Sequence, residues 1–404
     1  MISATEIRGR SRFIAAGFLM NLALGTIYSW SIFRTPLEES FDASPTESGL
    51  PYMLFLLFFA LSMPLGGALI RRIGPRFTAI AGSALVGMGW LLAGYSGSIA
   101  ILAVAYGVLG GVGVGLAYGV PLAVAGRWFA DRRGVALGLT LMGFGLSPLI
   151  TAPVAAAVIG AVSVLPAFRI MGTALFLLLV VLSMVMRYPD EREEAAVPAA
   201  PEGAAKATVE RDTREMLHTP QFYGLWTTYV IGTLVGLTAI GITGSFAQQT
   251  VGLTAGQAAL SVSVFALCNG LGRPLFGYIT DRLGVVAAVL LAFGAIILSS
   301  VLLLLGGGGS VVLFAISFAL FWMLLGGWLA IAPAGTTILF GAKHYPANYG
   351  LMYTAYGVGA VLGTLLSGQI NEIFGSYLYT FVPVILLAMI GMVIALLTLR
   401  KPVL

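Results

Sequence analysis

The sequence predicts an all-α membrane protein of about twelve transmembrane helices, arranged as two similar six-helix halves. Three observations carry this prediction: an apolar composition, apolar stretches that recur along the whole chain, and motifs that repeat after a fixed interval. Of 404 residues, 59% are hydrophobic and only 9% are charged, whereas a soluble domain averages roughly 45–50% and about 25%. One soluble core cannot hide this excess, so the solvent for most of this surface must be lipid.

Each apolar stretch is long enough to cross a hydrocarbon layer of about 30 Å as a helix. The expected spans are 12–33, 48–70, 77–95, 98–124, 134–158, 165–187, 222–246, 257–279, 285–305, 310–339, 348–371 and 376–398. The basic residues 1–12 continue directly into the first span, so we expect no cleavable signal peptide. The lone cysteine, Cys268, excludes an internal disulfide.

Lysine and arginine are distributed unequally between the two sides of these spans. Of the 21 basic residues, 18 fall at the termini, in even-numbered connections or in the long central connection. Arg34 and Arg169 fall on the opposite side, and Arg273 lies within a span. This bias places both termini in the cytoplasm, and we expect the plasma (inner) membrane. Because it also explains the net charge of +5, we expect no nucleic-acid partner.

Two loop motifs recur at similar intervals. The segment 67–76 is echoed 210 residues later by 277–284, and 128–134 is echoed 216 residues later by 344–350. These offsets indicate a duplicated six-span unit. Duplicated halves around a central site are typical of carriers that work by alternating access. The repeat therefore favours a carrier over a channel or a receptor.

The repeat divides the chain into three parts. We expect six-helix bundles at 1–187 and 220–404, joined by a charged cytoplasmic linker at 188–219 that is partly helical near 205–217. The chain shows no metal-ligand cluster, no nucleophile–base pair and no nucleotide loop. We therefore expect neither an enzyme, nor a cofactor, nor a metal site, and we expect the carrier to function as a monomer.

The loop pattern G-x-x-x-D-R-x-G is similar to the signature of the major facilitator superfamily. The copy at 277–284 fits it, whereas the first copy has Arg71 where the family usually has Asp. The resemblance implies that charged loop residues gate the conformational change. These candidates are Arg72, Arg76, Asp131, Asp281 and Arg282.

Other segments resemble the oxalate:formate antiporter and monocarboxylate-transporter branch of that superfamily. They are 28–30, 113–119, 126–134, 219–222, 269–274 and 348–350, which together cover most of the chain. The resemblance implies that Arg273 binds a substrate carboxylate. It also implies that Tyr356 stands where the oxalate exchanger has a lysine.

Arg273 is the most informative single residue. It lies about 12 Å inside its span at 1.5 Å per residue, and an intramembrane arginine costs at least ~2.5–3.5 kcal/mol on insertion scales. None of the 16 acidic residues lies deep in a span, so we expect the counter-ion to be a substrate carboxylate, which the guanidinium fork suits. The alternative is that Arg273 snorkels to the interface. Arg34, at the outer end of the first span, is expected to snorkel in that way.

Asn269 precedes Arg273 by four residues and therefore shares its helix face. It could orient the guanidinium, bind substrate, or only form an interhelical hydrogen bond. Aromatic side chains are expected to line the same cavity, although packing is the alternative for each. These candidates are Tyr28, Tyr118, Tyr353, Tyr356 and Trp328.

One cation suits a monoanion, so the expected partner is a small carboxylate such as lactate or pyruvate. The two histidines, His218 and His344, lie on the cytoplasmic side, which leaves no intramembrane relay for a proton. We therefore expect anion exchange, or symport in which the substrate carboxylate takes the proton. An oxalate/formate-type antiporter and a drug-efflux carrier of the same fold remain alternatives, and a channel or a non-transporting sensor stays open.

Overall fold

The computed structural model describes residues 4–129, 133–190, 193, 210–306, 309–341 and 343–399, and every regular element in these residues is helical. The first half contains α1 (Ala4–Leu24), the 3-10 helix η1 (Gly25–Ser29), α2 (Trp30–Phe41), α3 (Pro45–Ala93), α4 (Ile99–Leu102), the π-helix η2 (Ala103–Gly110), α5 (Gly111–Trp128), α6 (Arg133–Val162) and α7 (Val164–Val185). The second half contains α9 (Thr213–Leu217), α10 (Pro220–Gln249), α11 (Ala255–Leu305), α12 (Val311–Phe340), α13 (Tyr345–Met352), α14 (Thr354–Phe374), the 3-10 helix η4 (Tyr377–Thr380) and α15 (Phe381–Thr398).

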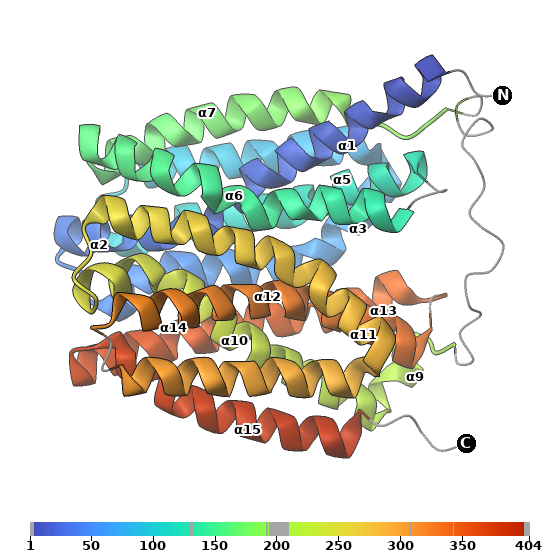
Figure 1. Cartoon of the computed structure of the whole chain (residues 1–404). Helices are drawn as coiled ribbons and strands as arrows, with labels where there is room; N and C mark the ends of the chain where they lie inside the picture. The colour runs from blue at the N-terminus through green and yellow to red at the C-terminus, as the bar shows by residue number, and fades with distance from the viewer. Residues whose placement is uncertain are drawn as a thin grey trace.

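The helices of the two halves form two groups that lie against each other (Figure 1). The first half (blue to green) packs on the second (yellow to red) chiefly through α3 with α14 and α6 with α11. The start of α1 and the end of α15 lie at the same end of the bundle, which we call the terminal end. The opposite end carries α2 and the start of α3.

Ten helical segments of the described chain are long and apolar enough to cross a membrane. Eight of them have 22–33 residues, whereas α3 and α11 have 49 and 51. A hydrocarbon layer needs only about 20 residues of helix. The chain is therefore a multi-pass membrane protein, and its two longest helices exceed the length of one crossing.

A glycine interrupts each of these long helices. Gly74 has φ 81° and ψ 168°, and Gly284 has φ 83° and ψ 169°, a backbone region essentially restricted to glycine. Both lie in the loop motifs that the sequence placed between neighbouring spans, 210 residues apart. The long helices also begin alike, at capping boxes whose N-caps are Ser44 and Thr254. The halves thus repeat in local structure as well as in sequence.

We expect Gly284→Ala to lower the free energy of unfolding by about 1–3 kcal/mol, because alanine does not tolerate this backbone conformation. An added Cβ meets nothing within 4 Å, so the loss is a backbone effect. Gly67→Ala is the matched control, since its Cβ also meets nothing but its backbone is helical. It should be neutral or stabilising by up to about 1 kcal/mol. Equal loss in both variants, measured by denaturation in detergent, would contradict the interpretation.

Arg34 does not snorkel, contrary to expectation. Its side chain is only 2% exposed, and its Nε donates to Ser48 Oγ at 2.9 Å and to Glu38 Oε1 at 3.3 Å. Its Nη2 donates to the carbonyl of Pro45, and the guanidinium lies 5.1 Å from the centre of the Tyr377 ring. Partners on three elements satisfy the charge inside the protein, so it has no need to reach the interface. We call these side chains the Arg34 cluster.

The described end of the linker is attached to the second half. Arg211 N–H donates to the carbonyl of Phe340, and Asn348 Nδ2 donates to the carbonyl of Arg211. Thr213, the first residue of α9, donates from its hydroxyl to Asn348 Oδ1. Helix α9 lies in the stretch where the sequence predicted partial helix, whereas residues 194–209 lie outside the described part. The division into bundles at 1–187 and 220–404 stays a prediction.

Candidate functional site

Arg273 lies on α11 where this helix packs against α6 of the other half. Its Nη1 donates to the carbonyl of Leu141 at 2.8 Å. Its Nε and Nη2 are buried and have no hydrogen-bond partner, and no acid pairs with it among the described residues. The interface between the halves therefore holds a guanidinium with two unused donors.

Asn269 lies one turn before Arg273 and is completely buried. Its Nδ2 donates to the carbonyl of Trp322 at 3.0 Å, and its Oδ1 has no partner. A Cβ built on Gly145 of α6 would lie 2.8 Å from Asn269 Oδ1 and 3.4 Å from Arg273 Nη2. The unpartnered atoms of the two side chains thus face the same small region of α6.

Two tyrosines join the halves beside this pair. The hydroxyls of Tyr28 on η1 and Tyr356 on α14 are hydrogen-bonded at 2.8 Å. Phe144 of α6 packs edge-on against Tyr28 and Tyr118, with ring centres 5.1 and 5.2 Å apart. Arg273 is close enough to interact electrostatically with the hydroxyls of Tyr28 and Tyr118, and the Tyr118 hydroxyl approaches the guanidinium without reaching regular hydrogen-bond geometry. The structure therefore gathers four predicted site residues, Arg273, Tyr28, Tyr118 and Tyr356, at the interface.

Phe59 of α3 joins this group, and sequence reasoning missed it. Its ring centre lies 5.2 Å from that of Tyr118, 5.8 Å from Tyr353 and 6.0 Å from Tyr356. Tyr353 in turn stacks on Tyr356 at 5.0 Å. A phenylalanine in an apolar span carries no sequence signal, because only its tertiary neighbours distinguish it from packing. We call Tyr28, Phe59, Tyr118, Phe144, Tyr353 and Tyr356 the aromatic group.

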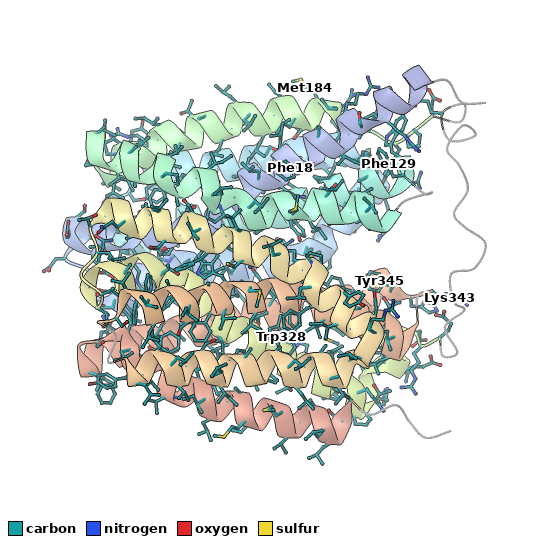
Figure 2. All side chains as sticks on the ribbon, viewed as in Figure 1. Phe18, Phe129, Met184, Trp328, Lys343 and Tyr345 are labelled. Atoms are coloured by element: carbon teal, nitrogen blue, oxygen red, sulfur yellow. The ribbon has the colours of Figure 1, made fainter. Side chains whose placement is uncertain are left out.

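Trp328 lies elsewhere. It is buried within the second half (Figure 2), with ring centres 6.3 Å from Tyr229 and 5.1 Å from Phe293. No described contact joins it to Arg273 or to the aromatic group. Its role as a substrate contact stays a prediction. In the described chain, no three His, Cys, Asp or Glu side chains gather as a metal site would require.

Comparison with known proteins identifies the family. The sequence profile of the Major Facilitator Superfamily matches residues 13–339 and 235–404. The chain belongs to this superfamily. It is 30% identical to the oxalate:formate antiporter of Oxalobacter formigenes over 366 residues, covering 90% of this chain and 85% of that protein. It is also 26% identical to monocarboxylate transporter 13 of Rattus norvegicus over 378 residues, covering 91% and 84%.

The superfamily fold is equally evident from solved structures. A bacterial homologue of the human lysosomal transporter Spinster, in an inward-facing and unoccupied conformation, superposes with a TM-score of 0.74. The two sequences are 16% identical, and the match covers 99% of this chain and 98% of the other. The relatives confirm the resemblance to the antiporter and monocarboxylate-transporter branch. The superposition on the Spinster homologue confirms the helical superfamily fold.

In this superfamily member, four of the predicted gating residues lie inside α3 and α11, beside the kinks at Gly74 and Gly284. Arg72, Arg76, Asp281 and Arg282 are exposed. Arg282 lies 5.5 Å from the ring centre of Tyr278, and Asp281 makes no ion pair with any described residue. The fifth candidate, Asp131, lies outside the described residues. The gating role of all five stays a prediction.

Further hydrogen bonds between the halves lie toward the end of the bundle opposite the terminal end. Glu372 Oε1 accepts from the N–H of Thr46 at 2.9 Å, which places a carboxylate of α14 on the first turn of α3. A helix N-terminus favours such a negative charge. Nearby, the hydroxyls of Thr35 and Ser245 lie 3.4 Å apart. These contacts hold the two halves together at that end.

We expect Tyr28→Phe and Tyr356→Phe each to weaken the contact between the halves by about 0.5–1.5 kcal/mol, the usual net value of one hydrogen bond. Because the two hydroxyls bond each other, the double variant should cost less than the sum of the single variants. Unfolding of the four proteins in detergent measures this double-mutant cycle. Strict additivity would show that the hydroxyl pair contributes nothing to stability.

Proposed function

We propose that this chain is a secondary transporter of a small organic monoanion, of the lactate or pyruvate type, working by alternating access. The observation that carries the proposal is Arg273, whose Nε and Nη2 are buried without partners at the interface between the halves. A charge left unpaired in a low-dielectric region is costly. A substrate carboxylate, accepting two parallel hydrogen bonds from the guanidinium fork, would supply the missing partner.

The position of Arg273 connects binding to the movement of the halves. The residue belongs to the second half, yet its Nη1 is bonded to the carbonyl of Leu141 in the first. A carboxylate at Nε and Nη2 would neutralise the guanidinium while α6 and α11 remain in contact. The halves could then move apart without leaving the Arg273 guanidinium unpaired in a low-dielectric region. This is how substrate would promote the exchange between inward- and outward-open states.

Charge favours a monoanion over a dianion. The polar side chains that the structure places around Arg273 are neutral, namely Asn269, Tyr28, Tyr118 and Tyr356. One arginine balances one carboxylate. The names of the two relatives, an oxalate:formate antiporter and a monocarboxylate transporter, support carboxylates as the substrate class. The absence of a lysine at Tyr356 favours monocarboxylates over oxalate.

We propose the following topology for the transporter. Helices α3 and α11 each cross the membrane twice and turn at Gly74 and Gly284, which raises the ten helical segments to twelve spans. Both termini and the linker face the cytoplasm, as the distribution of arginine and lysine favours. The chain lies in the plasma (inner) membrane and works as a monomer.

Transport by the protein in proteoliposomes tests the proposal. Vesicles loaded with unlabelled lactate should accumulate external labelled lactate transiently, and the uptake should saturate. Counterflow separates a carrier from a channel. Saturable transport of lipophilic cations without any response to monocarboxylates would favour the drug-efflux alternative instead.

The same vesicles distinguish the two coupling modes. Exchange requires an anion inside, so empty vesicles should take up no lactate even under an inward proton gradient. Symport of the anion with a proton predicts the reverse: a pH gradient alone should drive uptake without a counter-anion. Either result keeps the carrier proposal and selects one mode.

A further inference from the structure

Arginines and aromatic rings pack together at the terminal end of the first half. The rings of Phe13 on α1 and Trp128 on α5 are stacked, with centres 4.2 Å apart. The guanidinium of Arg187, which follows α7, lies 5.6 and 5.1 Å from the two ring centres. Trp128 Nε1 also donates to the carbonyl of Arg187 at 2.9 Å. The stack therefore joins α1, α5 and the end of α7 around one arginine.

Three more arginines surround this stack, each 4.2–4.9 Å from the centre of an aromatic ring. The pairs are Arg10 with Phe129, Arg12 with Phe13, and Arg127 with Tyr188. A ring that packs on the face of a guanidinium leaves the N–H groups at its edge available for other partners. We call Arg10, Arg12, Arg127 and Arg187 the arginine surface.

The described acids do not neutralise the arginine surface. Glu193 binds Arg187, accepting from its Nη1 and Nη2 at 2.5 and 2.7 Å. Asp190 Oδ1 accepts from the N–H of Glu193 at 2.9 Å. Arg12 and Arg127 are exposed, and neither makes an ion pair with a described acid. Two exposed guanidinium groups thus remain without a negative partner at the end of the membrane helices.

Exposed apolar side chains of α1 and α7 lead to the arginine surface. On α7, Val181 and Met184 are exposed on the outside of the bundle (Figure 2), and Arg187 follows within three residues. On α1, Leu19 is exposed, and it lies seven residues after Arg12, which returns to nearly the same helix face. Acyl chains can therefore lie along both helices with a headgroup at the arginines.

We propose that the arginine surface binds an anionic phospholipid. The phosphate oxygens accept hydrogen bonds from the guanidinium edges of Arg12 and Arg127, and the acyl chains lie on the exposed faces of α1 and α7. A zwitterionic lipid fits less well, because its headgroup brings a second positive charge towards the arginines. The bound lipid connects three helices of the first half. This inference is independent of the transported substrate.

The second half provides a comparison at the same end of the bundle. Arg211 and Arg214 lie there, beside α9 (Figure 1). Neither side chain lies over a described aromatic ring, in contrast to the arginine surface. A variant that loses these two arginines therefore loses the same charge without changing the proposed lipid site.

Lipid binding by the purified full-length protein tests the inference. Native mass spectrometry would measure the affinities for phosphatidylglycerol and for phosphatidylcholine with the same acyl chains. The wild type should bind phosphatidylglycerol about tenfold more tightly or better. In the double variant Arg12→Gln/Arg127→Gln this preference should disappear, and each single variant should lose part of it. Arg211→Gln/Arg214→Gln should keep the wild-type preference.

Three results would overturn the inference. Equal affinity of the wild type for the two lipids would exclude selection by charge. An equal loss of preference in the two double variants would mean that total positive charge, and not the arrangement of arginines on rings, attracts the lipid. Glycerol phosphate carries the phosphate without acyl chains. If it displaced phosphatidylglycerol completely, the surface would bind a soluble phosphate instead of a lipid.

Discussion

Replacing Arg273 with alanine is expected to abolish monocarboxylate transport and to weaken substrate binding by about 2–5 kcal/mol, the range for removing one partner of a buried charge pair. Every 1.4 kcal/mol is a factor of ten in affinity, so binding should weaken by roughly 30- to 4,000-fold. The reason is geometric as well as electrostatic. The guanidinium offers two adjacent unused donors, Nε and Nη2, and nothing else described at the interface replaces them.

Arg273→Ala should lose substrate binding without losing stability in the absence of substrate. Because the guanidinium of Arg273 lacks partners on two of its nitrogens, Arg273→Ala should unfold at the same temperature as the wild type or a higher one. Thermal shift with and without lactate measures both effects. Loss of stability in the absence of ligand, with an unchanged response to lactate, would make Arg273 a structural residue and favour the efflux alternative.

Two further variants sharpen this test. Arg273→Lys keeps the charge but not the planar fork, so it should retain part of the binding. Arg169→Gln removes an arginine that lies 4.9 Å from the ring centre of Tyr95, away from the interface between the halves, and should leave transport unchanged. If Arg169→Gln lost as much transport as Arg273→Ala, the loss would reflect the overall positive charge of the protein rather than a site at Arg273.

The Arg34 cluster should show the largest effect on stability. Arg34→Ala is expected to destabilise the protein by about 3–5 kcal/mol, as breaking a buried ion pair usually does. The carboxylate of Glu38 would keep its bond from Ser48 at 2.6 Å but would lose its counter-charge. Since the Tyr377 ring of the second half packs on the guanidinium, contact between the halves should weaken as well. Unfolding in detergent measures the loss.

Replacing both partners should cost less than removing one. Arg34→Met combined with Glu38→Leu leaves no unpaired charge, and such swaps of buried pairs are often neutral or stabilising. Glu39→Gln is the control, because Glu39 is exposed next to Glu38 and its loss should stay within about 0.5 kcal/mol. If Arg34→Ala were no worse than Glu39→Gln, the cluster would be electrostatically unimportant despite its burial.

Arg34 and Arg273 show how far sequence reasoning reaches. Both arginines lie outside the group of 18 basic residues that the sequence places on the cytoplasmic side. Because an unpaired charge inside the membrane is costly, each needs a partner or a route to water. For Arg34, the sequence shows acidic residues close by, Glu38 among them, but it could not show that α2 and α3 enclose the side chain. For Arg273, the lack of any nearby acid in the sequence agrees with the two unpartnered nitrogens in the structure.

The sequence by itself determined the membrane character, the helical superfamily fold and the repeat. These follow from local properties: hydropathy over about 20 residues, the side on which arginines fall, and loop motifs that recur after 210 and 216 residues. Only the tertiary structure decided which side chains meet. Phe59 joined the aromatic group, Trp328 lay elsewhere, and Gly145 faced Asn269 across the interface. Contacts between helices depend on rotation and packing of distant segments, and one sequence carries no local signal for them.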